Sequence, residues 1–429
     1  MNAGSTEENG NWHGQIPSDW RVQKLKRVFS GIDYGISEST SGEGSFQVLK
    51  MGNIVAGEIA FTNIEFVQDV DANLLLRPHD LLFNRTNSLD QVAKVGIFRG
   101  HSEGNVTFAS YLVRLRTSPR NHPNYINYVL NDEGFIGLAR KLAIPSVQQA
   151  NLNPTRYGRM EVPLPALPEQ KRIAAYLDVS CAAIDRAVET KQKQLETLDA
   201  LRKSIIQRAV TQGLNPEVKM KDSGTVHLGP VPQHWKVRRA KDVFEFHNHR
   251  RIPISSAERG VMNDRIYDYY GASGAIDKVE NYIFEGRYIL LAEDGANLLT
   301  RSKQLAFFAE GKFWVNNHAH VVKPWRGNEV YWVNLLESQD YSLAVTGSAQ
   351  PKLNMQNFGR FQIPVPPVDE QNEIADFVIR RSADCDKVID TLSAQIVTLT
   401  AYRKSLIHEC VTGRRRISET DVAKVKAHV

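Results

Sequence analysis

The sequence predicts an α+β fold: two β-rich domains in a pseudo-twofold arrangement, separated by two long antiparallel coiled-coil helices. Three observations predict it. The segment G-Q-I-P-S-D-W-R-V-Q-K-L-K-R-V-F from Gly14 returns as G-P-V-P-Q-H-W-K-V-R-R-A-K-D-V-F from Gly229. An L-N motif at Leu152, followed by V-P-L-P, returns at Leu353, followed by I-P-V-P. Finally, two long stretches without proline carry apolar residues at helical spacing.

The repeated unit keeps its two ends and changes its middle. Its start recurs after 215 positions, from Trp20 to Trp235, and its end after 201, from Leu152 to Leu353. The middle therefore differs in length, and it also differs in nearly all of its sequence. A period of about 200 residues is too long for a solenoid, so the repetition indicates a duplicated domain. Two copies of one frame with different contents suggest two domains that recognise different things.

Length and composition are those of a multidomain globular protein. A chain of 429 residues is expected to form two or three domains. The net charge of +5 is only a weak indication of a polyanionic partner, because a solvated surface explains it equally well. The three cysteines lie in predicted helices without C-x-x-C spacing, as in a reducing compartment. The polar N-terminus and the lack of a long apolar run predict a cytoplasmic protein without a membrane span.

Turn residues and prolines divide the chain into segments. Short apolar runs bounded by Gly, Asn, Asp and Pro predict strands, proline clusters precede each helix, and Gly213 and Gly413 end the helices. The expected order is a disordered tail (1–13), a first β-rich domain (14–165), a central helix (166–215), a linker (216–228), a second β-rich domain (229–365), a C-terminal helix (366–413) and a tail (414–429).

Each predicted helix carries an apolar stripe that is too long to remain exposed. Arg202 and Arg403 interrupt the two stripes at the same place of the repeat. We expect the helices to cover each other as an antiparallel coiled coil, or to meet a partner protein. The alternative is that each helix folds back on its own β-rich domain. The predicted interface residues are Ile184, Val188, Leu195, Leu198, Arg202, Ile205, Ile389, Leu392, Ile396, Leu399, Arg403 and Leu406.

Motifs that would carry catalysis are weak in this sequence. No phosphate-binding G-x-x-x-x-G-K-[ST] loop is present. Asn153-Pro154 only partly matches the Asn-Pro-Pro-Tyr tetrapeptide of nucleic-acid methyltransferases, and Glu217 stands in a linker as half of a nuclease pattern. His318 and His320 alternate on one predicted strand but lack a third metal ligand. The sequence therefore predicts no catalytic residue and no metal site.

Four duplicated features together resemble one family. They are the Trp-plus-basic start, the L-N…P-x-P end, the E-Q-K-R-I-A and E-Q-N-E-I-A segments from Glu169 and Glu370, and the R-K-S of each helix. Residues 14–413 are similar to the specificity subunit of type I restriction–modification enzymes. The stretches W-V-N-N-H-A-H-V from Trp314 and Y-G-A-S-G from Tyr270 resemble segments of target-recognition domains in that family.

The resemblance implies a non-catalytic subunit of a larger complex. Each β-rich domain would be a target-recognition domain that reads one half of an asymmetric, bipartite site in double-stranded DNA. The helices would dock two methyltransferase subunits, which in turn support motor–nuclease subunits. No cofactor is expected on this chain, since S-adenosylmethionine, ATP and magnesium would belong to the partners. Helix length would set the spacer between half-sites.

Candidate DNA-contacting residues follow a predicted strand or precede the L-N motif in each copy. Amide, hydroxyl and charged side chains are the groups that read base edges and phosphates. Polar surface turns have the same composition, so that interpretation stays open. The candidates are Arg85, Thr86, Asn87, Ser88 and Gln149 in the first copy, and Glu293, Asp294, Asn297, Gln350 and Lys352 in the second.

Two other classes of function remain as alternatives. A coiled-coil scaffold that binds only proteins would show no sequence preference on DNA and little salt dependence. A divergent, self-contained nuclease or methyltransferase would turn over alone with magnesium or S-adenosylmethionine, and substitution of Asn153 or Glu217 would abolish its activity.

Overall fold

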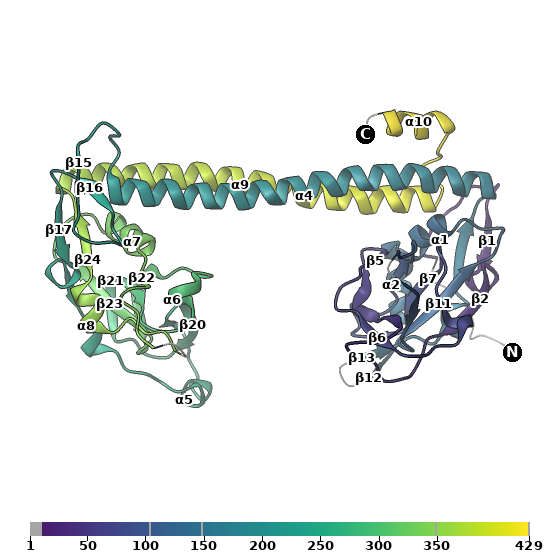
Figure 1. Ribbon diagram of the computed structural model, residues 1–429, viewed down its shortest axis with the longest axis horizontal. Helices are drawn as coiled ribbons and strands as arrows, with labels where there is room; N and C mark the ends of the chain where they lie inside the picture. The colour runs from purple at the N-terminus through teal and green to yellow at the C-terminus, as the bar shows by residue number, and fades with distance from the viewer. Residues whose placement is uncertain (1–10, 103, 147–148, 348–349, 428–429) are drawn as a thin grey trace. The chain divides into compact units, whose positions relative to one another are not determined.

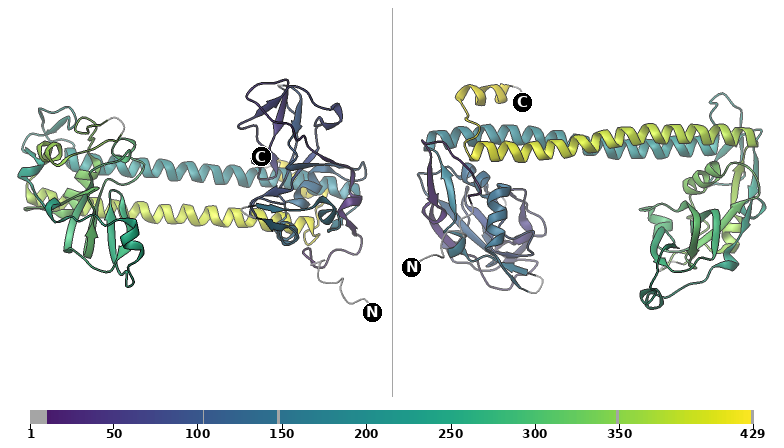
Figure 2. Two further views of the ribbon diagram at one scale, coloured as in Figure 1. Left: turned by 90° about the horizontal axis from the view of Figure 1, so that it is seen from below. Right: turned by 180° about the vertical axis from the view of Figure 1, so that it is seen from behind.

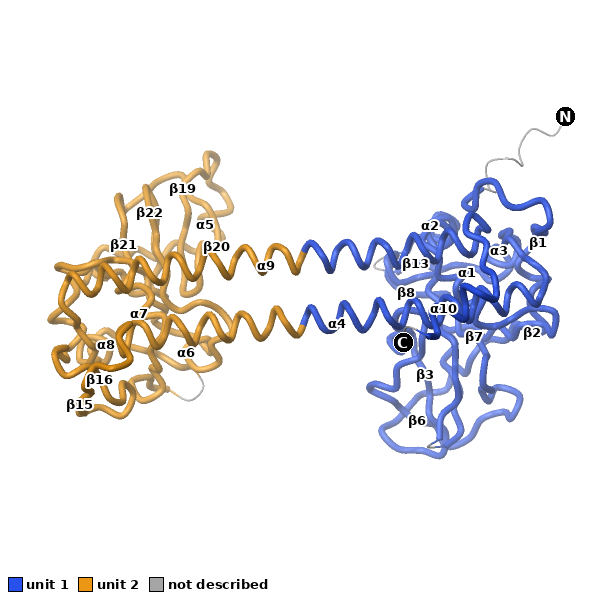
Figure 3. The backbone as a smooth tube through the Cα atoms, turned by 90° about the horizontal axis from the view of Figure 1, so that it is seen from above, with its two compact units in different colours: residues 1–192, 394–429 blue, residues 193–393 orange. Residues whose placement is uncertain are grey.

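The computed structural model describes residues 11–102, 104–146, 149–347 and 350–427, and the chain forms two compact units. Unit 1 comprises Met1–Gln192 and Ala394–Val429, and unit 2 comprises Lys193–Ser393 (Figure 3). Two long helices, α4 (Leu167–Gln212) and α9 (Val368–Val411), each begin in one unit and end in the other. Unit 1 is therefore assembled from two separate segments of the chain, whereas unit 2 is one continuous stretch.

Unit 1 is built around a six-stranded sheet of order β2-β11-β7-β9-β5-β4, with three smaller sheets, β1-β14, β10-β3-β6 and β12-β13-β8 (Figure 1). Its strands are β1 (Arg21–Lys24), β2 (Phe29–Tyr34), β3 (Phe46–Leu49), β4 (Ile54–Val55), β5 (Glu58–Ile59), β6 (Glu65–Val67), β7 (Leu81–Asn84), β8 (Thr86–Asn87), β9 (Val95–Ile97), β10 (Val106–Phe108), β11 (Leu112–Thr117), β12 (Ile144–Ser146), β13 (Gln149–Asn151) and β14 (Glu161–Leu164). Besides the ends of α4 and α9, its helices are α1 (Pro123–Leu130), α2 (Glu133–Lys141), α3 (Pro154–Tyr157) and α10 (Glu419–Ala427).

Unit 2 has a six-stranded sheet of order β18-β23-β21-β22-β19-β20 and two two-stranded sheets, β15-β16 and β17-β24. Its strands are β15 (Met220–Asp222), β16 (Pro230–Pro232), β17 (Lys236–Arg239), β18 (Phe244–Phe246), β19 (Tyr267–Gly271), β20 (Gly274–Val279), β21 (Phe284–Ala292), β22 (Ala306–Val315), β23 (Ala319–Pro324) and β24 (Gln362–Val365). Its shorter helices are α5 (Ser256–Gly260), α6 (Asn297–Thr300), α7 (Glu329–Ser338) and α8 (Met355–Arg360). The predicted α+β class, with two β-sheet domains and two long helices packed together, is confirmed.

The duplication extends into the middle of the repeat, where the sequence does not show it. In both units the first four strands of the main sheet are antiparallel neighbours, and the fifth runs parallel to the fourth. The Arg85 carbonyl accepts from the Leu152 amide at 2.8 Å, and the Glu293 carbonyl accepts from the Leu353 amide at 2.7 Å. Arg85 and Glu293 therefore occupy equivalent positions in the two copies, although their charges are opposite.

The residues shared by the two copies hold the frame together. The Tyr125 hydroxyl donates to the Pro163 and Val411 carbonyls in unit 1. In unit 2, the hydroxyl of Tyr331 donates to the carbonyls of Val210 and Pro364. In each unit, the tyrosine connects a short helix of the β domain to two places. One is the C-terminal end of one long helix, and the other is the strand that directly precedes the second long helix. The buried Gln170 and Gln371 side chains likewise bind the turns that start α1 and α7. These motif residues thus serve the fold.

The predicted stripes lie in the seam between α4 and α9. Stripe positions step alternately by three and four residues, the heptad spacing of a coiled coil, and are buried or half-buried between exposed neighbours. In unit 1 Asp185 pairs with Arg403 at 2.9 Å, and Lys191 donates to Gln395 at 2.6 Å. The helices are antiparallel, because rising numbers on α4 meet falling numbers on α9. Both views of Figure 2 show the two helices side by side.

The two interrupting arginines make the same contact in each copy. Arg202 pairs with Asp386 at 2.7 Å in unit 2, and this is the repeat equivalent of the Arg403–Asp185 pair in unit 1. Polar residues at seam positions fix the register of a coiled coil because a shift leaves them without partners. The reciprocal pairs therefore specify one alignment of the two helices.

The helices also pack on the β domains, so the two expected arrangements occur together. In unit 1 the start of α4, with Ile173 and Leu177, and the end of α9, with Leu406 and Cys410, join the core of the β domain. In unit 2 the end of α4 and the start of α9 do the same, with Val210 and Val378. The antiparallel pair and the fold-back are thus two parts of one arrangement.

Some residues of the expected tail and linker segments are ordered parts of the units. Residues 1–10 lie outside the described structure, but Trp12 donates to the Glu161 carbonyl at 2.9 Å and packs on Phe135. At the other end of the chain, Arg416 binds Asp19 through two hydrogen bonds of 2.8 and 2.7 Å. The linker region supplies β15, and the last segment supplies α10. Within the described residues, no helix is long and apolar enough to span a membrane.

The equivalent tryptophans of the two starts provide an internally matched test. The Trp235 indole N–H donates to Glu370 at 2.9 Å, whereas the buried Trp20 indole N–H has no partner in the described chain. A hydrogen bond to a charged group contributes about 1.5–3 kcal/mol. We therefore expect W235F to lower the free energy of unfolding by about 1.5–3 kcal/mol more than W20F. Chemical denaturation of both variants measures the difference, and equal losses would contradict the expectation.

Candidate functional site

The polar candidates of unit 1 gather at one sheet edge. Thr86 and Asn87 form β8, which pairs with β13, and β13 pairs in turn with β12. Asn151 donates to the Thr86 hydroxyl at 2.9 Å, so the short strand is held by side chains as well as backbone. The structure therefore brings Thr86, Asn87 and Gln149 into one small three-stranded sheet, with Arg85 directly before β8 and Ser88 directly after it.

Arg85 directly precedes this sheet, and its guanidinium has no polar partner among the residues that the structure describes. The Arg85 amide donates to the Tyr111 carbonyl at 3.1 Å, and the Leu152 amide completes the backbone pairing. The guanidinium carbon lies 5.2 Å from the centroid of the Tyr34 ring. Arg85 Nε is buried, and no hydrogen bond or ion pair to it occurs in the described residues. Tyr34 and Tyr111, which sequence reasoning missed, are about half exposed at 50% and 48%.

The equivalent place in unit 2 is an internally paired ion cluster. Glu293 is buried, contacts Arg251 at 2.5 Å and lies 3.3 Å from Lys352 Nζ. Burial raises the pKa of the Glu293 carboxyl, but His320, Arg251 and Lys352 lower it more, so that the pKa is below its usual value. Glu293 was a candidate for DNA contact. Its position instead suits holding the adjacent loop, because its carboxylate is already satisfied.

A buried histidine adjoins this cluster. Burial lowers the pKa of His320 to about 4, and Glu293 and the Leu353 carbonyl oppose the shift only in part. The ring is therefore neutral near pH 7. Its Nε2–H donates to the Leu353 carbonyl at 2.7 Å, so that Nδ1 accepts from the Asn248 amide at 2.8 Å. The imidazole thus links β23 to the start of the L-N motif.

Unit 2 also has a hollow of about 350 Å³, to whose wall several polar side chains contribute. Asp294 and His318 lie on its wall, with the two Asp294 oxygens 2.9 and 2.8 Å from His318 Nδ1. Asn297 binds the backbone of Lys303 and so shapes the opposite side. The two stretches that resemble target-recognition domains, from Tyr270 and from Trp314, both supply wall residues. The lining consists of Gly271, Ala272, Ser273, Ile276, Asp294, Gly295, Ala296, Asn297, Ser302, Lys303, Asn316 and His318.

The remaining candidates of unit 2 lie on the strand-like segment before Leu353. Lys352 forms isolated bridges with Asp294 and with Thr346, and its side chain is about half exposed. Gln350 is exposed two positions earlier. Both copies thus place a short segment before the L-N motif against the loop that follows the central strand. The candidates from distant parts of the sequence are neighbours in each unit.

The residues weighed for catalysis have structural roles. The Asn153 side chain caps α3 by accepting from the Thr155 amide at 2.7 Å, and Asn354 caps α8 by accepting from the Asn357 amide at 2.8 Å. His318 binds Asp294 and His320 is buried in the hydrogen bonds above, so the two rings do not converge. Among the described residues, no group of three or more His, Cys, Asp or Glu side chains is arranged to hold a metal ion.

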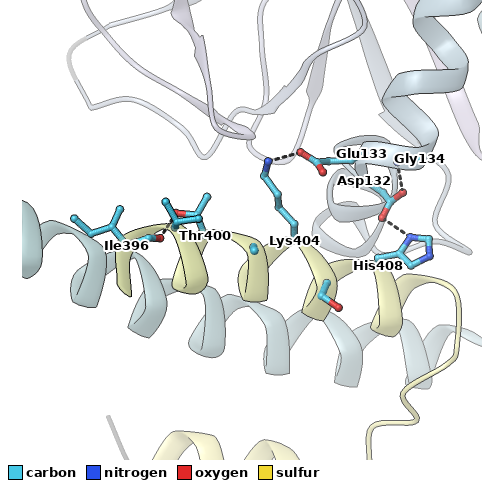
Figure 4. A pocket seen from close by; sticks show the side chains of 10 residues that line it. Asp132, Glu133, Gly134, Ile396, Thr400, Lys404 and His408 are labelled. Atoms are coloured by element: carbon cyan, nitrogen blue, oxygen red, sulfur yellow. Dashed lines mark hydrogen bonds and ion pairs between the residues drawn. The ribbon is translucent and has the colours of Figure 1, made fainter. Parts of the chain in front are cut away.

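The helix surface of unit 1 offers a different kind of site. An open hollow of about 760 Å³ lies along α9 at the start of α2. Figure 4 shows Lys404 and His408 reaching from α9 to Glu133 and Asp132, at 2.5 and 3.0 Å. Val397 on its wall is 69% exposed. Most of the predicted stripe residues are half-buried along the helix pair, and one of them, Ile396, also lines this hollow.

Comparisons with known proteins agree on one family. A family model described as the type I restriction modification DNA specificity domain matches residues 232–396. The chain is 27% identical to a putative type I restriction enzyme MjaX specificity subunit of Methanocaldococcus jannaschii, over 52% of each chain. It is 20% identical to the StySPI specificity subunit of Salmonella potsdam, over 93% of this chain and 90% of that protein.

By family model and by relatives, the chain is similar to the specificity subunits of type I restriction–modification systems.

One solved structure shows that the similarity extends to the fold. A chain from a type I restriction–modification complex superimposes with a TM-score of 0.70 over 92% of this chain and 98% of the other, at 12% identity. At that identity the likeness concerns the fold. The match to the first curated relative spans about half of that relative's length, 52%. The family motifs at Gln170 and Gln371 are the frame residues described above, and the candidate edges lie in the divergent middle of each copy.

His320 makes a pH dependence of stability testable. Its folded pKa lies below the unfolded value of about 6.5, so acidification from about pH 6.5 towards 4 protonates the unfolded chain first. We expect unit 2 to lose up to roughly 3 kcal/mol of stability across this range. Both H320Q and H320L remove the titrating ring and should flatten this limb, whatever their effect at pH 7. Denaturation at a series of pH values measures it, and an unchanged slope in both variants would refute the assignment.

Proposed function

We propose that the chain is the DNA-specificity subunit of a type I restriction–modification complex and has no catalytic role of its own. Each β domain reads one half of a bipartite site in double-stranded DNA. The observation that carries the proposal is the pair of equivalent sheet edges with unlike chemistry, Arg85 in one copy and Glu293 in the other. A common frame with different edge residues suits the reading of two different sequences.

Candidate DNA contacts are the polar groups at these edges. In unit 1 they are the side chains of Arg85, Asn87, Ser88 and Gln149. In unit 2 they are the groups that line the hollow or precede the L-N motif: Ser273, Asp294, Asn297, Lys303, His318, Gln350 and Lys352. Amides and hydroxyls read base edges, and lysines neutralise phosphates. Unlike contents in the two copies predict a site that is not palindromic.

The proposed partners are two methyltransferase subunits, docked on the outward faces of α4 and α9, and motor–nuclease subunits bound through them. Exposed apolar side chains on these faces support the assignment: Val397 and Tyr402 in unit 1, and Leu201 and Val388 in unit 2. S-adenosylmethionine, ATP and magnesium belong to these partners in the proposal. The complex would act on cellular DNA in the cytoplasm.

A methylation profile of a host genome tests the proposal. The host carries the gene for this chain with its neighbouring methyltransferase gene, and the comparison strain lacks only this chain. We expect a bipartite adenine-methylation motif that disappears with the chain. An unchanged profile, with the complex shown to be expressed, would exclude the proposal and favour the protein-binding scaffold.

Unit-specific substitutions should affect different half-sites. Gln149→Ala changes the sheet edge of unit 1, and Asp294→Asn changes the hollow of unit 2. Each substitution should therefore weaken base specificity in only one half of the methylation motif. A wrong base typically costs about 1–3 kcal/mol in binding. Methylation profiles of the two variants measure the effect. Relaxation of the same half-site by both substitutions would contradict the assignment of one half to each unit.

A further inference from the structure

We propose that Arg85 reads a guanine in one half-site, donating two parallel hydrogen bonds to N7 and O6 in the major groove. The inference rests on the proposed function and goes beyond it by naming a base and the side chain that selects it. It starts from the unpartnered guanidinium of Arg85 and from the composition of the surrounding strands.

The unpaired state of Arg85 calls for an external acceptor. Folded proteins rarely leave buried polar atoms without a hydrogen bond, because the lost hydration is not replaced. Arg85 Nε is buried and has no hydrogen bond or ion pair among the described residues, and the guanidinium lies over the face of the Tyr34 ring. The equivalent Glu293 is neutralised by Arg251 and Lys352 within its own unit. Arg85 is thus the charge of this pair that is left for a ligand.

The backbone of Arg85 is held in place, while its guanidinium makes no hydrogen bond within the described part of the chain. Its amide and carbonyl are both held, by Tyr111 and Leu152, so the Cα cannot shift without breaking the sheet edge. The nearby ring of Tyr34 restricts the guanidinium further. A planar fork held in one place suits a bidentate acceptor with fixed geometry.

Both guanine and phosphate present such acceptors, and the neighbours of Arg85 favour the base. The strands β8, β12 and β13 contain amides and hydroxyls, in Asn87, Ser146, Gln149 and Asn151, and no lysine or arginine. Phosphate surfaces are rich in cations, whereas amides beside a single arginine are the groups that read adenine and guanine edges. The antiparallel pair β12–β13 is also an element that the major groove admits.

The test compares methylation profiles of complexes that contain wild-type chain, R85Q, R85K or R120Q. Arg120 is an exposed arginine of the same unit, so R120Q removes the same charge elsewhere. The wild-type motif should contain a G·C pair in one half-site. R85Q should lower the discrimination against other base pairs at that position alone by roughly 5- to 150-fold. R85K, which keeps the charge but loses the fork, should lie between, and R120Q should keep the wild-type motif.

Affinity measurements with the purified complex separate the two acceptors. Fluorescence anisotropy over a range of salt compares a duplex of the wild-type motif with duplexes changed at that one pair. Uniform weakening of all duplexes by R85Q, with a salt slope shallower by about 1, would show a phosphate contact and overturn the inference. Thermal unfolding should be unchanged in R85Q, and marked destabilisation in both R85Q and R85K would make Arg85 a structural residue instead.

The outcomes distinguish this inference from the proposed function. A wild-type chain that directs no bipartite motif refutes the proposed function itself. A clear bipartite motif that R85Q leaves unchanged, or one without a G·C pair in either half-site, refutes only the role of Arg85.

Discussion

The seam between α4 and α9 is the constraint on which each unit depends. Neither stripe can remain in water over such a length, and each is covered by the other helix and, near its ends, by a β domain. The reciprocal pairs Arg202–Asp386 and Arg403–Asp185 fix the register by placing charge in the seam. The ends of both helices also belong to the cores of the β domains. The register of the helix pair therefore determines which helical residues pack in each core.

The duplication separates two kinds of residue. Residues that are the same in both copies hold the fold together, and residues that differ lie at the sheet edges. The shared tyrosines, glutamines and L-N motifs bind backbone groups of neighbouring segments, and those contacts work the same way in both units. The edge positions of Arg85 and Glu293 have equivalent backbone hydrogen bonds, so their side chains can differ without disturbing the sheet. Recognition can therefore change in one copy while the fold and the other copy are kept.

Interpretation of single residues from the sequence was less successful than that of repeats. Asn153 and Glu293 had a plausible chemical role by residue type, yet one caps a helix and the other is buried among its own counter-ions. Tyr34, Arg251 and Lys303 carried no signal, because their relevance comes from segments distant in the sequence. The usable signals were the two family-like stretches, which supply Ser273, Asn316 and His318 to the lining of the hollow.

The sequence by itself determined the duplication, the α+β class and the long helices, because repeats and heptad spacing are local patterns along one chain. It also predicted which residues face the seam, since that prediction depends only on helical periodicity. Tertiary structure alone decided that the divergent middles form two separate sheets with the same strand directions and that β8 meets the β12–β13 hairpin. It also decided that Arg85 Nε has no partner among the described residues while Glu293 is neutralised. Those properties depend on long-range pairing and on the local balance of charge and burial, which no spacing in the chain encodes.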